Sequence, residues 1–156
     1  MDAVINASPL ILLSKINLLC LLNKLFCMVY IPRAVLQEVQ EINKVEMAIN
    51  FSELSFVPLE VSNKIAIRGL LGRLHIGEAE VIIGAIEKGI AMVVIDESIA
   101  RNKAKQFGLK VTGTLGILLK ARKRGLIEDI SQEIIKLKNA GMYLSDEIVE
   151  QVLKRF

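Results

Sequence analysis

The amino-acid sequence predicts an α/β protein with a central parallel sheet covered by helices on both faces. Short runs rich in β-branched residues alternate with segments of helical periodicity, and the connections between them are short. This alternation is typical of parallel strands joined by crossover helices. The chain has 156 residues, 53% of them hydrophobic, which is enough for one ordinary domain with a substantial core. We therefore expect residues 1–156 to form a single domain.

The first half of the chain predicts three strands and three helices. A short buried strand is expected at 3–5, followed by a helix that opens in Asn6-Ala-Ser-Pro, with Ser8 as its N-cap and Pro9 as its first residue. The next expected elements are a helix at 17–26, a strand at 28–31, a long helix at 33–50 and a strand at 56–61. Five apolar residues recur at helical spacing and define the inner face of the long helix: Val35, Val39, Ile42, Val45 and Ile49.

The second half predicts two strands, each between two helices. A helix at 77–88 ends at Gly89, and the run AMVVI at 91–95 is the clearest buried strand. A helix at 98–107 ends at Gly108, and a strand follows at 109–111. The remaining expected elements are a helix at 113–124 that ends at Gly125, and two further helices at 131–140 and 145–155.

The apolar segment 10–30 raises the question of membrane insertion. Lys15 and Lys24 lie within it, and each would cost about 2.5–3.5 kcal/mol near the centre of a spanning helix. Two short buried helices are therefore expected in place of a membrane span. No basic region precedes the first apolar run, which argues against a signal peptide, and we expect a cytoplasmic protein.

The charge of the chain is unevenly distributed. The net charge is +3, but residues 98–127 contain no acid and carry +8, whereas the remainder carries −5. The bases of this segment are Arg101, Lys103, Lys105, Lys110, Lys120, Arg122, Lys123 and Arg124. The pattern has two interpretations, which are the solvated faces of two helices and a polyanion-binding flank beside a carboxylate site.

Polar residues follow three of the predicted strands. Asn6 follows the first strand, Asp96-Glu97 follows the AMVVI strand, and Thr112-Gly-Thr114 follows the next. Ligands of open α/β sheets bind outside the carboxyl ends of the strands, so these residues are candidates for a site. Asp96, Ser98 and Thr114 also lie where N-caps are expected, and capping is the commoner role for such a residue on its own.

Two glutamates complete a candidate oxygen-ligand cluster with Asp96. Glu38 borders the apolar face of its helix, where a carboxylate is costly unless it is paired or bound to a metal. Glu80 lies in the first turn of the helix at 77–88, where the helix dipole alone would also explain it, although Glu78 suits that role better. Clustered carboxylates bind Mg²⁺ or Mn²⁺, which can activate water against a phosphodiester. His75 is the single histidine, which argues against a serine or cysteine hydrolase.

Five segments together resemble PIN-domain proteins of the prokaryotic toxin-like group, including a subfamily with a GEAE helix. The segments are VINASPLI at 4–11, YIPRAVLQEV at 30–39, LHIGEAEVII at 74–83, VIDES at 94–98 with Ala100-Arg101, and VTGTLG at 111–116. Their order and spacing match along nearly the whole chain. The resemblance implies a three-layer α/β/α fold and a metal-dependent endoribonuclease that uses Mg²⁺ or Mn²⁺.

The resemblance also implies a role for individual residues. The positions of the family's four acids fall on Asn6, Glu38, Glu80 and Asp96, of which Glu38, Glu80 and Asp96 would hold the metal. Glu97 is an adjacent spare carboxylate, and Thr112 and Thr114 match a polar position that supports the site. RNA phosphates would bind the basic residues Arg101, Lys103, Lys105, Lys120, Arg122, Lys123 and Arg124.

The residue at the first acidic position departs from the family pattern. Asn6 offers a metal a carbonyl oxygen but no charge, so an alternative is a catalytically silent PIN-like module that binds RNA or a protein partner. The resemblance further implies a small antitoxin protein as partner and a homodimer. The high hydrophobic content is consistent with a dimer interface.

Overall fold

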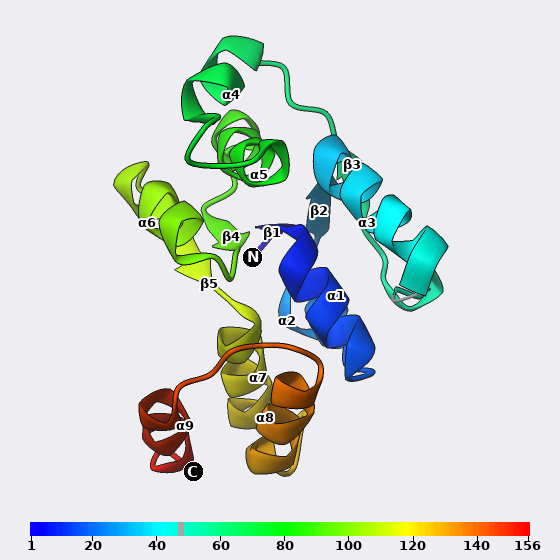
Figure 1. The fold of residues 1–156 in the computed structure, drawn as a ribbon, viewed down its shortest axis with the longest axis vertical. Coiled ribbons are helices and arrows are strands. Elements are labelled where there is room, and N and C mark those ends of the chain that lie inside the picture. The colour runs from blue at the N-terminus through cyan, green and yellow to red at the C-terminus, as the bar shows by residue number, and fades with distance from the viewer. Residues whose placement is uncertain (47–48) are drawn as a thin grey trace.

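Five parallel strands form the centre of the molecule in the computed structural model, which describes residues 1–46 and 49–156 (Figure 1). The strands are β1 (Ala3–Ile5), β2 (Val29–Pro32), β3 (Val57–Leu59), β4 (Met92–Val94) and β5 (Lys110–Thr112). Their order in the sheet is β3-β2-β1-β4-β5, and every neighbouring pair is parallel. The predicted parallel α/β architecture is therefore confirmed.

Helices connect the strands and cover both faces of the sheet. They are α1 (Ala7–Lys15), α2 (Leu21–Leu25), α3 (Arg33–Glu46), α4 (Lys64–Leu70), α5 (Ile76–Lys88), α6 (Ser98–Gln106), α7 (Thr114–Lys123), α8 (Ile130–Asn139) and α9 (Asp146–Leu153). A short 3-10 helix, η1, spans Phe51–Glu53. From β1 the chain adds β2 and then β3 on one side, and it then returns past β1 to add β4 and β5 on the other side. Because crossovers between parallel strands are right-handed, this reversal of direction places helices on both faces of the sheet. This is a three-layer α/β/α arrangement.

Helix α5 forms the central contact of one face. It packs against β1, β2 and β4, and Glu78 to Ala85 are all buried along its length. Figure 1 shows α4, α5 and α6 on one side of the sheet and α1, α7 and α8 on the other. Helices α1 and α2 both contact α7, which joins the second layer. Gly89, at φ 69°, ends α5 in the left-handed conformation that favours glycine.

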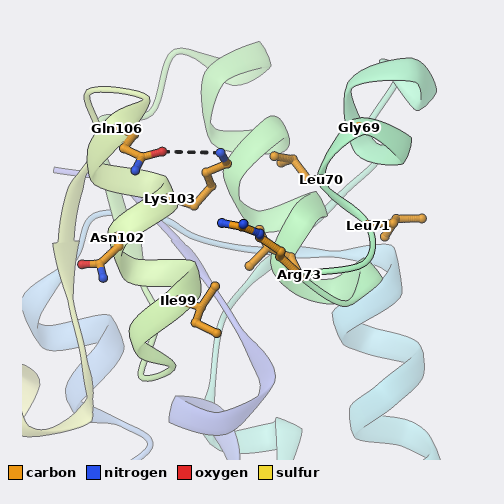
Figure 2. Close-up of a pocket in the computed structure, with 9 residues that line it drawn as sticks. Gly69, Leu70, Leu71, Arg73, Ile99, Asn102, Lys103 and Gln106 are labelled. Atoms are coloured by element: carbon orange, nitrogen blue, oxygen red, sulfur yellow. Dashed lines mark hydrogen bonds between the residues drawn. The ribbon is translucent and has the colours of Figure 1, made fainter.

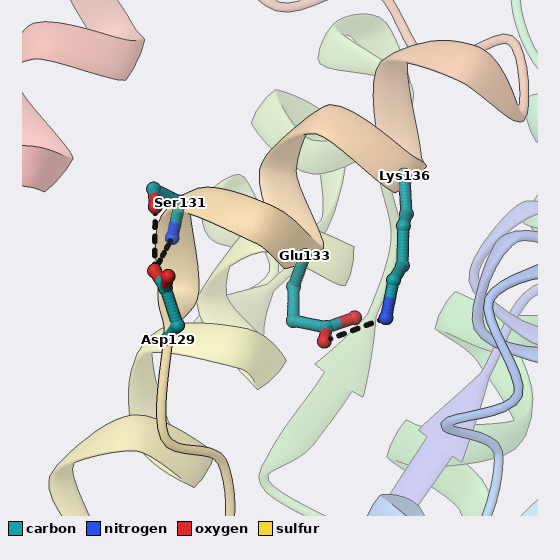
Figure 3. A network of polar contacts seen from close by, with 4 residues as sticks. All are labelled: Asp129, Ser131, Glu133 and Lys136. Carbon is teal, nitrogen blue, oxygen red and sulfur yellow. Dashed lines mark hydrogen bonds and ion pairs between the residues drawn. The ribbon is translucent and has the colours of Figure 1, made fainter.

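Local polar contacts fix helix α8, the last helix but one of those described, which packs on α7. Figure 3 shows Asp129 at its start, where the carboxylate accepts a hydrogen bond of 2.9 Å from the backbone N–H of Ser131. The hydrogen bonds from the Ser131 hydroxyl and N–H lower the pKa of Asp129. One turn further on, Glu133 and Lys136 form an ion pair of 3.0 Å. These contacts give α8 an N-cap and an intrahelical pair, both common at exposed helix surfaces.

Several boundaries predicted from the sequence are wrong. Asn6, and not Ser8, is the N-cap of α1, because the Ser8 hydroxyl bonds elsewhere. The helix expected at 17–26 is the five-residue α2, since Asn17 adopts a left-handed φ of 58° just after α1. Helix α4 and η1 were not predicted.

The expected inner face of the long helix is wrong at its C-terminal end. Val35 and Val39 are fully buried, but Val45 is 85% exposed. Ile49 is buried outside the helix, where the Asn43 side chain binds both its N–H and its carbonyl. Residues 47–48 of the expected helix lie outside the described residues.

The apolar segment 10–30 does not form a membrane span, because none of the described helices is long and apolar enough to cross a bilayer.

The two valines of α3 provide a matched test of this packing. Val39→Ala removes buried methyl groups and should lower the free energy of unfolding by about 1.5–3 kcal/mol. Val45→Ala removes the same atoms from an exposed position and should change it by less than about 0.5 kcal/mol. Urea denaturation of both variants measures the difference, and equal losses would contradict the packing of α3.

Candidate functional site

The register of the sheet brings three chain segments to one edge. Ile5 pairs with Val94, and Val94 pairs with Thr112, so β1, β4 and β5 end side by side. The N–H of Asn6 donates to the carbonyl of Val94 at 3.0 Å, which fixes the exit of β1 against β4. The residues after these strands therefore converge at the carboxyl edge, as the sequence predicted for Asn6, Asp96 and Thr114.

Asp96 is the most highly bonded side chain of this edge. Its Oδ1 accepts a hydrogen bond of 2.7 Å from the N–H of Thr114, and its Oδ2 accepts one of 2.7 Å from the Thr114 hydroxyl. The Ser8 hydroxyl also donates to Oδ2, at 3.1 Å. A residue just beyond the end of β4 thereby holds the first turns of both α1 and α7. The expected N-caps are corrected, because Glu97 and Gly113 occupy the cap positions of α6 and α7.

One glycine and two threonines allow this close packing. A Cβ on Gly113 would lie 2.7 Å from Oδ1 of Asp96 and 2.9 Å from Nη1 of Arg101, so only glycine fits without displacing one of them. Nη1 of Arg101 donates to the Ile95 carbonyl at 2.8 Å. Thr112 and Thr114 are both buried, and the Thr112 carbonyl accepts from the N–H of Ile95 at 2.8 Å. Both threonines thus support the edge, Thr114 through its side chain.

Asn6 carries an unsatisfied polar atom. The residue is only 2% exposed, and its Oδ1 has no hydrogen-bond partner among the described residues. Buried amide oxygens are nearly always paired with a donor or bound to an ion or water. The backbone of Asn6 bonds to the end of β4, so its unpaired oxygen is a candidate ligand from a residue at this edge.

A second group of carboxylates lies around the first turn of α5. Glu38 of α3 approaches this turn at Gly77, where a Cβ would lie 3.2 Å from Oε2 of Glu38. Glu78, the next residue, is buried and accepts a hydrogen bond of 3.3 Å from the N–H of His75. Its Oε1 lies 3.1 Å from Nε2 of His75.

Electrostatics links Glu78 to two other acids. Burial raises the pKa of Glu78 above its usual value near 4.5, while the His75 side chain and N–H oppose the shift. The charges of Glu97 and Glu38 raise the pKa of Glu78 further. Glu78 therefore belongs to the carboxylate group, although the sequence favoured a helix-dipole role for it. The close approach of Glu38 at the preceding glycine is a tertiary contact that the sequence pattern did not reveal.

Glu80, the third acid expected from the sequence, has a different environment. It is buried, and its Oε2 accepts a hydrogen bond of 2.8 Å from the N–H of Ala34 in the first turn of α3. A carboxylate in this place satisfies a free N–H and interacts favourably with the positive end of the helix dipole. The hydrogen bond ties α5 to the start of α3.

Two hollows adjoin the carboxylates and share Glu97. One, of about 460 Å³, is lined by His75, Glu78 and Glu97 together with residues of the loop before α5. The other, of about 430 Å³, is lined by Ser8, Asp96, Glu97 and the segment around Tyr143. The acids thus face an open surface that a large substrate could reach.

The expected metal-binding trio does not form a compact group. Within residues 1–46 and 49–156, no three His, Cys, Asp or Glu side chains lie close enough together to hold a metal ion. The carboxylates and the unpaired Asn6 Oδ1 nevertheless offer oxygen atoms, and oxygen ligands suit a hard cation such as Mg²⁺ or Mn²⁺. The donor types fit such an ion, although Asp96 already accepts three hydrogen bonds.

The basic residues divide between the two ends of the sheet. Arg101 lies at the carboxyl edge, and Lys103 follows on the same helix. The C-terminal end of α7 lies at the opposite edge. Lys120 packs over the ring of Phe26, and Arg124 donates a hydrogen bond to the carbonyl of Lys24, and both of these partners precede β2 in the chain. Arg122 packs over Phe156, whereas Lys105 and Lys123 are exposed. The expected flank beside the carboxylates is therefore limited to α6.

Comparison with known proteins gave one match. A family model described as a PIN domain matches residues 2–156. No curated protein and no solved structure matches the chain significantly.

Asp96 should be essential for the stability of this edge. Asp96→Ala leaves the N–H and hydroxyl of buried Thr114 without acceptors and should cost about 2 kcal/mol or more. Asp96→Asn should cost less than about 1.5 kcal/mol, because its amide oxygen can still accept from the Thr114 N–H and its NH₂ can donate to a hydroxyl. Urea denaturation compares the two variants. An alanine variant as stable as wild type would contradict the hydrogen-bond arrangement.

Glu78 should give the stability a distinct pH dependence. Its pKa is raised in the fold, so the protonated form is favoured, and this contribution to stability is lost as the pH rises above about 4.5. The substituted side chain of the Glu78→Gln variant cannot ionise, so the melting temperature of this variant relative to wild type should increase between about pH 4 and about pH 8. Glu150→Gln, an exposed change on α9, controls for the loss of one charge. A difference that decreases with pH would mean that the contact with His75 dominates.

Proposed function

The chain belongs to the PIN-domain family, and from this premise we propose that it is a metal-dependent endoribonuclease, acting as the toxin of a toxin–antitoxin pair. The observation that carries the proposal is the buried, unpaired Oδ1 of Asn6, a residue whose backbone N–H bonds to Val94 at the end of β4, two residues before Asp96. An unsatisfied oxygen at the carboxyl edge of a parallel sheet is expected where a ligand binds.

We propose that Asp96 binds the metal directly, with the Asn6 amide oxygen as a neutral further ligand. Because no three acids of the described residues lie close enough together to hold the ion directly, Glu38 and Glu78 would act on it through the waters that Mg²⁺ or Mn²⁺ retains. Mg²⁺ or Mn²⁺ bound there would supply Lewis-acid stabilisation of the phosphodiester and a water of lowered pKa. Burial, and after it the charges of Glu97 and Glu38, raise the pKa of Glu78, and a cation close to these acids would favour the ionised carboxylate. Glu80 takes a positioning role in this proposal, because its carboxylate already binds the Ala34 N–H.

The protein groups around the acids have definite tasks in this proposal. The Thr114 and Ser8 hydrogen bonds orient the Asp96 carboxylate and keep it from rotating. Arg101, anchored on the Ile95 carbonyl, supplies a fixed positive charge close to Asp96, where an RNA phosphate would approach. Lys103 extends this charge along α6. The open hollows on either side of Glu97 leave room for a strand to pass.

The toxin role, the antitoxin partner and the homodimer are supported by the sequence resemblance. Large apolar side chains exposed on the surface, among them Ile65, Ile99 and Tyr143, are consistent with a protein partner. The silent binding module remains the alternative, and two observations favour it. Asn6 contributes no charge, and no compact acidic trio forms within the described part of the chain.

The test compares two glutamates of α3 that are three residues apart. Glu38→Gln should lower the rate of Mn²⁺-dependent RNA cleavage by about 100-fold or more, the scale of losing one oriented charge at an active site. Glu41, which is exposed and paired with Lys44, provides the matched control, and Glu41→Gln should cleave like wild type. Cleavage is followed on labelled RNA with Mn²⁺ and with EDTA, and calorimetry measures Mn²⁺ binding.

The outcomes separate the two functions. EDTA-sensitive cleavage that Glu38→Gln loses, together with weaker Mn²⁺ binding, supports the enzyme. RNA binding without cleavage or Mn²⁺ binding in the wild type would overturn the nuclease and leave the binding module. Equal cleavage by Glu38→Gln and Glu41→Gln would remove Glu38 from the site.

A further inference from the structure

A separate hollow of about 590 Å³ lies between helix α6 and the loop that joins α4 to α5 (Figure 2). The loop contributes Leu71 and Arg73, and α6 contributes Ile99, Asn102 and Lys103. The volume is that of a typical site for a small ligand. No Asp or Glu is among the described residues that line this hollow.

Two cations point into the hollow from opposite walls. Figure 2 shows the guanidinium of Arg73 and the ammonium of Lys103 both directed into the space between the loop and α6. Lys103 bonds only weakly, at 3.4 Å, to the Gln106 side chain. Arg73 has no ion pair or hydrogen bond from its side chain among the residues described. Like charges that share a hollow without a neutralising acid favour an anionic ligand.

The hollow continues into the carboxylate site. Arg73, Leu74 and Ile99 line both this hollow and the neighbouring one that contains Glu78 and Glu97. A ligand that extends from the acids along the surface therefore reaches Arg73 and then Lys103. The hollow lies on the α4–α5 side of α6, away from the basic end of α7.

We propose that this hollow is a subsite for one nucleotide of single-stranded RNA, next to the bond that is cut. Arg73 and Lys103 bind its phosphate, and the Asn102 and Gln106 amides with the apolar Leu71 and Ile99 side chains contact its base and sugar. A nucleotide combines one anionic group with a flat, partly apolar base, which matches two cations beside amide and apolar groups. The proposal rests on the proposed function, because only a nuclease substrate would extend into the hollow from the acids.

The experiment measures RNA binding without cleavage. A short fluorescein-labelled oligouridylate is titrated with protein in EDTA over a series of salt concentrations, and fluorescence anisotropy gives the affinity. Arg73→Gln and Lys103→Gln should each weaken binding and reduce the slope of log K against log salt by about 0.7, the effect of one phosphate contact on a single strand. Arg68→Gln and Lys64→Gln, exposed changes on α4 outside the hollow, should keep the wild-type slope. Melting curves verify that each variant is folded.

Each outcome decides the proposal. Wild-type binding with the same slope in Arg73→Gln and Lys103→Gln overturns the subsite, and a parallel Mn²⁺ cleavage assay then shows whether the proposed nuclease still stands. If the wild type neither binds nor cleaves RNA, the subsite and the nuclease fail together. If a polyglutamate peptide binds the wild type as tightly as the RNA does, and binds both variants more weakly, the RNA subsite is overturned and the hollow is a site for acidic peptides. A reduced slope in the two variants, together with cleavage by the wild type, supports the subsite, whereas a reduced slope without any cleavage overturns its place beside a cut bond and leaves only an RNA-binding hollow.

Discussion

The architecture of the carboxyl edge depends on the side chain of Asp96. Its two oxygens accept hydrogen bonds from the N–H and hydroxyl of Thr114 and from the hydroxyl of Ser8. A single side chain, just beyond the end of β4, therefore holds the first turns of both α1 and α7. Gly113 is required beside it, because any Cβ there would collide with Asp96 or Arg101. The cost of desolvating this carboxylate is offset by charge-assisted hydrogen bonds, which are stronger than neutral ones. The polar residues of three separate segments can therefore share one edge.

The sequence was sufficient to predict the parallel sheet and the polar residues at its carboxyl edge. The strands are short β-branched runs, and five of the described helices, α4 to α8, end one or two residues before a glycine with positive φ, so local chemistry determines the order of elements. The positions of Asn6 and Asp96 follow from parallel register alone. Val45 misled the prediction because helical spacing does not reveal where the neighbouring layer ends. Helix α4 has few buried side chains, so its apolar signal is weak.

The carboxylate group was harder to predict, because its members meet only through tertiary contacts. Glu78 reads locally as a helix-dipole residue, and it does bind the His75 N–H. Its link to Glu38 depends on α3 crossing the first turn of α5 at Gly77, and its link to Glu97 depends on α6. Arg73 lies in a loop that has no periodic pattern, and its position opposite Lys103 comes from how the loop between α4 and α5 lies along α6. Residue types could be predicted here, whereas their neighbours could not.

The geometry of α5 explains why its two glutamates act differently. Residues two positions apart on an α-helix point about 200° apart around its axis, so Glu78 and Glu80 cannot face the same neighbour. Glu80 binds the Ala34 N–H and holds the first turn of α3. Glu78 faces the hollow that contains Glu97. Because Glu38 lies on that same α3 helix, the hydrogen bond of Glu80 also sets how closely Glu38 approaches Gly77. One carboxylate of the motif thus fixes the framework that brings the other into its acidic surroundings.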